Sequence, residues 1–193
     1  MRKGILGVSN LNLKLQEILN PAGAYKKEKE YKDMVFREGD KVMQTKNNYS
    51  LKWVRVSGEG ESEGMGIFNG DVGYIEEIND DENTITILFD DERKVVYDSI
   101  YIDEIDLAYS ITIHKSQGSE FPVVVIPVFM GPPMLMNRNL LYTGITRAKQ
   151  MVVLVGSRKS LKYMIDNNKG FDRYSMLKWR IKDIVEHGLE ESR

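Results

Sequence analysis

The sequence contains no cysteine and only two histidines among its 193 residues. The lack of cysteine excludes disulfide bonds, thiolate zinc sites and a cysteine nucleophile, and it suits the reducing cytoplasm. With two histidines and no cysteine, we expect no structural or catalytic transition-metal site. The longest apolar run, residues 123–130, contains Pro127. It is far shorter than the roughly 20 residues of a membrane-spanning helix, so we expect a cytoplasmic protein.

The chain also has little net charge, −2 from 27 basic and 29 acidic side chains. Proteins that bind nucleic acid through a large surface are usually basic, so any such surface here must be a local patch. With 41% hydrophobic and 29% charged residues, the chain has the composition of a globular protein with a buried core.

The first third of the chain predicts a helix followed by a small β-structure. Leu11, Leu15 and Ile18 recur at helical spacing. The charged residues 25–33 that follow are typical of a solvated linker. From residue 36 to about 104, short alternating runs and turn residues predict a small β-barrel.

From residue 105 the pattern predicts an α/β fold. Continuous apolar runs alternate with segments of helical spacing, which is typical of a parallel sheet with covering helices. The β-rich middle therefore interrupts or precedes an α/β domain. The runs expected to form buried strands are residues 110–114, 122–128 and 151–156, and a short helix is expected over residues 157–168.

A dense polar cluster, residues 112–120, lies between two of these expected strands. Polar loops at strand ends are where α/β sheets bind ligands. Gly118 would allow close approach of the backbone, and Glu120 could bind a ribose hydroxyl. The alternative is an ordinary surface loop with a capped turn.

Arg147 lies on a segment rich in glycine and threonine, just before the last expected strand. An arginine at such a place can bind a phosphoryl group through two hydrogen bonds and stabilise charge during its transfer. A lone arginine is also common in a surface ion pair, so the residue alone leaves both interpretations open.

Taken together, these segments resemble the conserved motifs of superfamily 1 DNA helicases. Residues 111–128 (ITIHKSQGSEFPVVVIPV) closely resemble motif V, and residues 140–156 (LLYTGITRAKQMVVLVG) resemble motif VI. Residues 12–21 are similar to the opening of the second motor domain in RecD-type helicases, the family of exodeoxyribonuclease V alpha subunits. Residues 36–49 and 66–78 resemble the SH3-like insertion of that subgroup.

The resemblance implies a RecA-like parallel-sheet motor domain, made of residues 1–35 and 105–193, with an SH3-like β-barrel inserted at residues 36–104. It implies the C-terminal part of a helicase that hydrolyses ATP and moves along single-stranded DNA. The implied partners are that DNA, a first RecA-like motor domain of the same polypeptide and, in some relatives, other exonuclease V-type subunits.

The resemblance also assigns roles to residues. Part of motif V contacts single-stranded DNA and part lies at the nucleotide cleft, with Gln117 between them. The motif VI arginine acts as an arginine finger. We expect Glu120 and Arg147 to meet on one rim at the carboxyl ends of neighbouring parallel strands. The matching positions are Thr112, His114, Lys115 and Ser116 for DNA, and Gln117, Gly118, Glu120 and Arg147 for the nucleotide.

No G-x-x-x-x-G-K-[ST] phosphate loop occurs, and no glycine is followed by lysine anywhere. Residues 87–92 (ILFDDE) imitate a Walker B strand, but the sequence after them predicts a hairpin. We therefore expect ATP and Mg²⁺ to be bound mainly by a motor domain that this sequence lacks, and the chain alone to be inactive as an ATPase. The alternative is a stand-alone module that binds nucleic acid or protein without motor activity.

Overall fold

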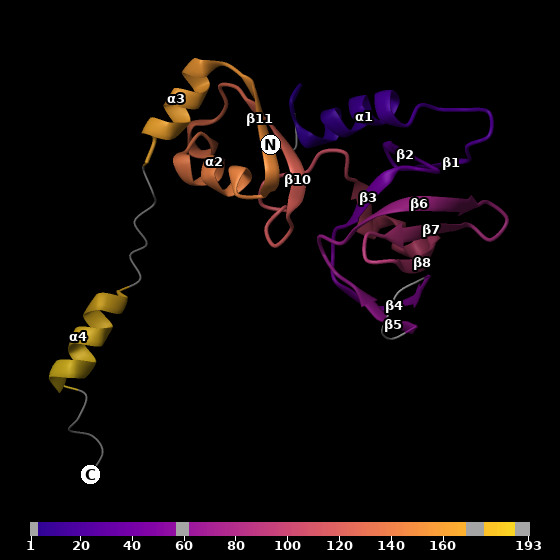
Figure 1. Ribbon diagram of the computed structural model, residues 1–193. Helices are drawn as coiled ribbons and strands as arrows, with labels where there is room; N and C mark the ends of the chain where they lie inside the picture. Colours follow the sequence, from indigo (N-terminus) through magenta and orange to yellow (C-terminus); the bar gives the residue numbers. More distant parts are fainter. Residues whose placement is uncertain (1–3, 57–61, 169–175, 188–193) are drawn as a thin grey trace, which may run out of the picture.

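The structure is a computed structural model that describes residues 4–56, 62–168 and 176–187. A curled antiparallel sheet and a smaller parallel sheet with two helices lie beside each other, and helix α1 (Val8–Leu19) lies near their junction (Figure 1). Helix α4 (Leu177–His187) lies apart from both. Among the described residues, no helix is long and apolar enough to cross a membrane.

The antiparallel sheet has seven strands in the order β5-β4-β8-β7-β6-β3-β9 and curls into a half-barrel. Its strands alternate between buried and exposed residues, as in β7, where Ile85, Ile87 and Phe89 are buried. This confirms a small curled β-structure in the middle of the chain. The strands are β3 (Lys41–Gln44), β4 (Asn48–Arg55), β5 (Glu63–Ile67), β6 (Val72–Asn79), β7 (Thr84–Phe89), β8 (Arg93–Asp98) and β9 (Ile105–Leu107).

Strands β7 and β8 form an antiparallel hairpin, with Thr84 opposite Asp98 and Leu88 opposite Lys94. The acidic residues of the ILFDDE segment therefore lie at a hairpin turn, as the sequence predicted. The short 3-10 helix η1 (Ser99–Glu104) follows β8 and leads into β9, which closes the sheet edge against β3.

The residues expected to be a solvated linker are partly a second hairpin. Strand β1 (Glu28–Tyr31) pairs with β2 (Met34–Arg37), and Lys32 adopts a positive φ of 54° in the turn. The linker prediction was wrong here because alternating charged and aromatic side chains can form an exposed two-stranded ribbon. Tyr31 and Met34 pack against the barrel core, which gives the ribbon its apolar support.

The parallel sheet contains two described strands, β10 (Phe121–Val128) and β11 (Ala148–Gly156). Ile126 and Val128 on one face pack with Leu141 of α2 and Met164 of α3. This confirms the predicted helix after Ser157, which caps α3 by accepting a hydrogen bond from the Ser160 amide. The remaining elements here are α2 (Arg138–Ile145), α3 (Arg158–Asp166) and the 3-10 helix η2 (Pro133–Leu135).

The opposite face of the parallel sheet is open. Val123 and Val125 of β10 are 47% and 61% exposed, and their neighbours Met151 and Val153 of β11 are 56% and 38% exposed. Parallel sheets are normally covered on both faces. The described residues thus leave one apolar face of this two-stranded sheet uncovered.

The expected strand at residues 110–114 does not form. Residues 109–120 consist of bends and turns instead. Hydrogen bonds within the segment replace strand pairing, because the Lys115 and Ser116 amides both donate to the Thr112 carbonyl, at 2.9 and 3.2 Å. A short β-branched run next to hydroxyl side chains can therefore satisfy its backbone locally.

Helix α1 forms as predicted but does not bury the face that its leucines indicate. Ile18 is 72% exposed, whereas Asn12 and Gln16 are each 3% exposed. The buried face is thus polar, and it points at the junction between the two sheets, where its amides find hydrogen-bond partners.

We predict that Gly73→Ala destabilises the barrel. A Cβ on Gly73 in β6 would lie 2.5 Å from the Leu88 carbonyl oxygen and 2.9 Å from the Phe89 Cα. Backbone atoms of a paired strand cannot move away easily, so the free energy of unfolding should fall by about 1–3 kcal/mol. Urea unfolding would measure the change. A Cβ on Gly23 would meet nothing within 4 Å, so Gly23→Ala is the matched control. Equal stability of the two variants would contradict the close approach.

Candidate functional site

The segment between β9 and β10 carries the predicted polar cluster as a compact loop. Hydrogen bonds of successive turns shape it, including one from the Ser119 amide to the Ser116 carbonyl at 3.1 Å. Gly118 has a φ of +89°, a conformation that side-chain-bearing residues rarely adopt. The loop therefore needs glycine at this position, whatever it binds.

The predicted site residues differ in how accessible they are. His114, Gln117, Gly118 and Glu120 are exposed on the loop. Ser116 is 5% exposed, and its hydroxyl donates to the Ile113 carbonyl at 2.8 Å. The hydroxyl of Ser116 is thus used inside the loop, while its exposed neighbours are available to a ligand.

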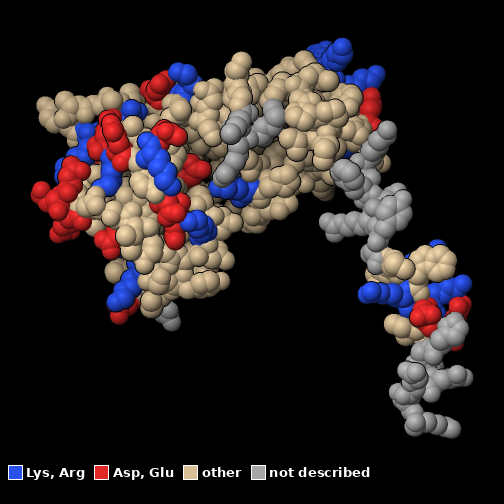
Figure 2. Space-filling view, turned by 180° about the vertical axis from the view of Figure 1, so that it is seen from behind, with Lys and Arg blue, Asp and Glu red and all other residues tan. Residues whose placement is uncertain are grey.

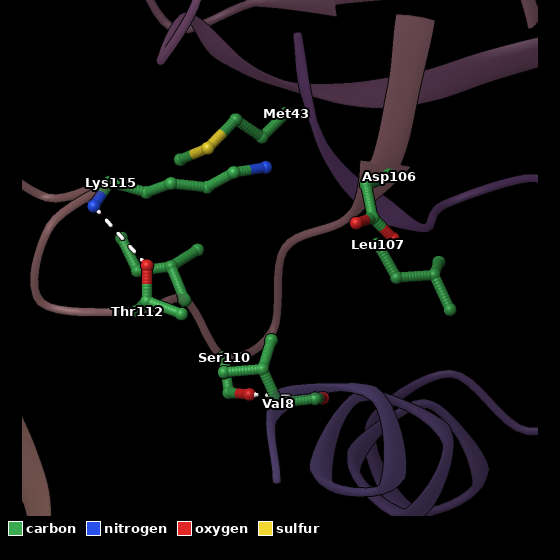
Figure 3. A pocket seen from close by; sticks show the side chains of 8 residues that line it. Val8, Met43, Asp106, Leu107, Ser110, Thr112 and Lys115 are labelled. Atoms are coloured by element: carbon green, nitrogen blue, oxygen red, sulfur yellow. Dashed lines mark hydrogen bonds between the residues drawn. The ribbon is translucent and has the colours of Figure 1, made fainter. Parts of the chain in front are cut away.

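The first half of the loop lies against α1 and the barrel (Figure 3). The Lys115 side chain extends beside Met43 of β3, and its amide donates to the Thr112 hydroxyl at 3.3 Å. On the other side, the Ser110 hydroxyl donates to the Val8 carbonyl at 3.4 Å. The cavity between these side chains has a volume of about 10 Å³. Such a volume holds about one water molecule, so a ligand would bind the outer surface of the loop.

Arg147 lies between the end of α2 and the start of β11. Its Nε donates to the Thr143 carbonyl at 3.3 Å, and one terminal nitrogen donates to the Ser119 carbonyl at 3.4 Å. The other terminal nitrogen is 3.4 Å from the Thr146 hydroxyl. These bonds are long and their acceptors are uncharged, so the guanidinium group keeps its capacity to bind an anion.

The structure brings the two predicted motifs together. The Phe121 amide donates to the Arg147 carbonyl at 2.8 Å, and Phe121 pairs with Ala148 at the start of the parallel sheet. Next to this pair, Lys149 Nζ lies 3.4 Å from Glu120 Oε2, both side chains being 59% exposed. Glu120 and Arg147 therefore share one rim of the molecule.

That rim is at the amino ends of the two strands, and the prediction of carboxyl ends was wrong. Glu120 directly precedes β10, and Arg147 directly precedes β11. The prediction assumed a strand at residues 110–114 that would end in the polar cluster. Because that strand is absent, each motif belongs to the strand that follows it.

A groove of about 360 Å³ lies between the barrel and residues 119–122, which form the end of the loop and the start of β10. Burial raises the pKa of Asp90 in this groove, and the charge of Lys41 partly opposes the effect. Arg93 forms ion pairs with Asp71 and Asp91, at 2.7 and 2.5 Å. The lining thus combines both signs of charge and offers no site selective for phosphate.

Figure 2 shows the same mixture of charge over the barrel surface, where acidic and basic side chains alternate. Lys46 pairs with Asp103, and Lys94 pairs with Glu76.

Within the described ranges, His, Asp and Glu side chains form no group that could hold a metal ion. On the rim, the guanidinium group of Arg147 is of a kind that can bind an anion such as a phosphoryl group.

Sequence reasoning missed the residues that connect this loop to the rest of the chain. Asn12 and Gln16 on α1 are followed, at the same interval of four residues, by Asn20, which caps the end of the helix, and all three are buried. The spacing was visible in the sequence, but amides at helical spacing are usually an exposed face. Gln16 and Asn20 bind Asp40, which is fully buried and which the sequence marks only by a glycine–aspartate pair typical of a turn. Asn12 instead binds the Leu107 carbonyl and the Ser110 amide.

Two family models match the chain in the order of its parts. The first is described as ATP-dependent RecD-like DNA helicase SH3 domain and matches residues 11–89. The second is described as UvrD-like helicase C-terminal domain and matches residues 107–155. The first match runs from α1 to the end of β7, and the second covers the loop and nearly all of the parallel sheet.

Individual proteins agree with these matches. The ATP-dependent RecD2 DNA helicase of Deinococcus radiodurans is 32% identical over 157 residues, which are 81% of this chain and 19% of that protein. The RecBCD enzyme subunit RecD of Haemophilus influenzae is 29% identical over 173 residues, or 86% of this chain and 22% of that protein. The chain thus spans about a fifth of the length of these relatives.

A solved structure of two coordinating Pif1 helicases at forked double-stranded DNA is also similar, with 20% identity and a TM-score of 0.47. The match covers 93% of this chain and 42% of that chain. The sequence matches agree over both parts of the chain and in their order. Over these two parts, the chain is similar to RecD-like and UvrD-like DNA helicases.

Proposed function

We propose that this chain is the C-terminal part of an ATP-dependent helicase that translocates on single-stranded DNA. The observation that carries the proposal is the shared rim, where the backbone of Arg147 binds the amide of Phe121 beside Glu120. A residue that senses the nucleotide and a loop that contacts DNA must be mechanically connected in such an enzyme. Here, one pair of neighbouring strands joins them.

On the nucleotide side of the rim, Arg147 supplies positive charge to a phosphoryl group, while Gln117, Gly118 and Glu120 contact other parts of ATP. Three features support this assignment: the exposed side chains, the open backbone at Gly118 and the weakly bound guanidinium group. Mg²⁺ and most contacts to ATP would come from the first RecA-like motor domain, since the described residues contain no cluster of three or more His, Asp or Glu side chains that could hold a metal ion.

On the DNA side, Thr112, His114 and Lys115 contact the phosphate backbone. His114 is exposed, and Lys115 lies on the barrel side of the loop. Ser116 would contribute through the loop backbone, because its hydroxyl is bonded to Ile113. A lysine and backbone amides are common contacts to phosphate, and they select no sequence.

The motor domain in this proposal consists of residues 1–35 and 105–193, with the barrel inserted at residues 36–104. The bare apolar face of β10 and β11 supports the proposal that further parts of a RecA-like domain cover this sheet. The complete protein would act in the cytoplasm, alone or with other exonuclease V-type subunits; the similar RecD protein of Haemophilus influenzae is a subunit of the RecBCD enzyme.

The barrel would guide the DNA strand through exposed aromatic side chains. Tyr49 is 69% exposed and lies edge-to-face with Phe68, their ring centroids 5.7 Å apart. Aromatic rings on small β-barrels stack on unpaired bases. Trp53 is a poorer candidate, because it packs against the barrel core.

We predict that this chain alone shows no ATP turnover, and that Arg147→Ala in the complete polypeptide lowers kcat by about 10³-fold or more. An arginine finger acts only on a nucleotide that other residues hold, so it has no effect in isolation. The Arg147 side chain makes only long hydrogen bonds, so the free energy of unfolding should change by less than about 1 kcal/mol. Steady-state ATP hydrolysis with single-stranded DNA and thermal unfolding would measure both effects.

The control is Arg158→Ala, which removes an exposed arginine at the start of α3, on the same part of the chain. It should leave kcat unchanged. Robust ATP turnover by this chain alone, abolished by Arg147→Ala, would falsify the proposal that another motor domain must hold the nucleotide for Arg147. Binding of single-stranded DNA that does not respond to nucleotide in the complete polypeptide would favour a binding module instead.

We also predict that Tyr49→Ala weakens binding of single-stranded DNA by about 5- to 100-fold, the loss expected for one stacked base. Fluorescence anisotropy at fixed salt would measure the affinity. Tyr25 is fully exposed and lies outside the barrel, so Tyr25→Ala is the control and should bind normally. If both variants bind as the unaltered protein does, the barrel does not guide the strand through this aromatic pair.

A further inference from the structure

A buried carboxylate lies where α1 and the barrel meet the loop of residues 109–120, which is called the motif V loop below. Asp40, in the turn between β2 and β3, is 0% exposed. Its Oδ2 accepts hydrogen bonds from Gln16 Nε2 at 2.6 Å and from the Arg37 amide at 2.7 Å. Its Oδ1 accepts from Asn20 Nδ2 at 2.7 Å and from the Tyr109 hydroxyl at 2.8 Å.

Burial of a carboxylate is costly unless donors replace the lost water. Asp40 has four donors, and they come from three separate segments of the chain. Hydrogen bonds to a charged acceptor are short and strong, so each segment is fixed relative to the others. Burial, together with the bond to Asp40, raises the pKa of Tyr109, which keeps its hydroxyl protonated as a donor.

Asn12 of α1 binds the chain on either side of Tyr109, at the end of β9. Its Nδ2 donates to the Leu107 carbonyl at 2.6 Å, and its Oδ1 accepts from the Ser110 amide at 2.6 Å. Residues 107–110 are thus bound by α1 through Asn12 and by the barrel through Asp40. Thr112, the first residue proposed to contact DNA, follows two positions after Ser110.

The far end of the loop has a different attachment. Ser119 and Phe121 are bound to Arg147, at the start of the parallel sheet. The loop therefore spans two anchors, with its DNA-contacting half fixed to the barrel and its nucleotide-contacting half fixed to the arginine. A shift of the barrel relative to the parallel sheet must change the loop between them.

We propose that Asp40, Tyr109 and Asn12 are positioning residues that fix the DNA-contacting half of the motif V loop to the barrel and α1, so that barrel movement is transmitted to the nucleotide rim. This inference rests on the proposed function and adds to it the route by which DNA held at the barrel would regulate ATP hydrolysis.

The test compares two hydrogen-bonded tyrosines in the complete polypeptide, Tyr109, which is partly buried, and Tyr97, which is fully buried. Tyr109→Phe removes the hydroxyl that binds Asp40. Tyr97→Phe is matched to it, because the Tyr97 hydroxyl donates to Gln44 Oε1 at 2.8 Å inside the barrel, away from the loop. Both variants lose one internal hydrogen bond, so a general loss of stability affects both.

The first measurement is amide hydrogen exchange over residues 110–117. Tyr109→Phe should speed exchange there by about fivefold or more, since one hydrogen bond to a charged group is lost. Tyr97→Phe should leave these amides unchanged. Equal exchange in both variants would overturn the inference. Asn12→Ala, which removes the second attachment, should act in the same direction as Tyr109→Phe and replaces it if that variant does not fold.

The second measurement is the ratio of DNA-stimulated to basal ATP turnover. Tyr109→Phe should lower the ratio by about fivefold or more, the range of ordinary coupling between sites, with basal turnover unchanged. If exchange is faster but the ratio of turnover rates is unchanged, the proposal that barrel movement is transmitted to the nucleotide rim is overturned. Absence of DNA-dependent turnover in the unaltered protein would overturn the proposed function instead, and exchange would still decide whether Tyr109 fixes the loop.

Discussion

The parallel pairing of β10 with β11 is the constraint on which the site depends. Residues Phe121 and Ala148 are far apart in sequence, but their strands start side by side, and the Phe121 amide binds the Arg147 carbonyl. Any side chain that directly precedes one strand is therefore next to those that precede the other. Glu120 and Arg147 share a rim for this reason alone, without a direct bond between them.

A second constraint gives that rim a connection to the barrel. Asp40 must keep its donors to remain buried as a carboxylate, so α1, the β2–β3 turn and Tyr109 stay together. The motif V loop is thus attached at one end by charge-assisted hydrogen bonds and at the other by strand pairing. One loop thus connects the seven-stranded sheet to the parallel sheet, and this loop carries the polar cluster.

Much of this arrangement could be predicted from local pattern, including both parallel strands, the β7–β8 hairpin and the helix after Ser157. The pattern failed at residues 110–114, where Thr112 accepts local hydrogen bonds that compete with strand pairing. It also misjudged α1, which buries Asn12 and exposes Ile18. Burial of an amide depends on a partner distant in sequence, here the Leu107 carbonyl, and local spacing does not contain that information.

The absence of cysteine allows a direct test of the shared rim. With Phe121→Cys and Ala148→Cys, the only two thiols in the chain stand at directly paired positions of β10 and β11, each next to one of the two rim residues. Directly paired residues on adjacent strands lie about 4.8 Å apart, within the range of about 4.4–6.8 Å between Cα atoms that a disulfide requires. The account predicts rapid disulfide formation under mild oxidation in the complete polypeptide with its own cysteines replaced, and none for Phe121→Cys with Arg158→Cys. No disulfide in the first pair, or equal yields in both, would contradict it.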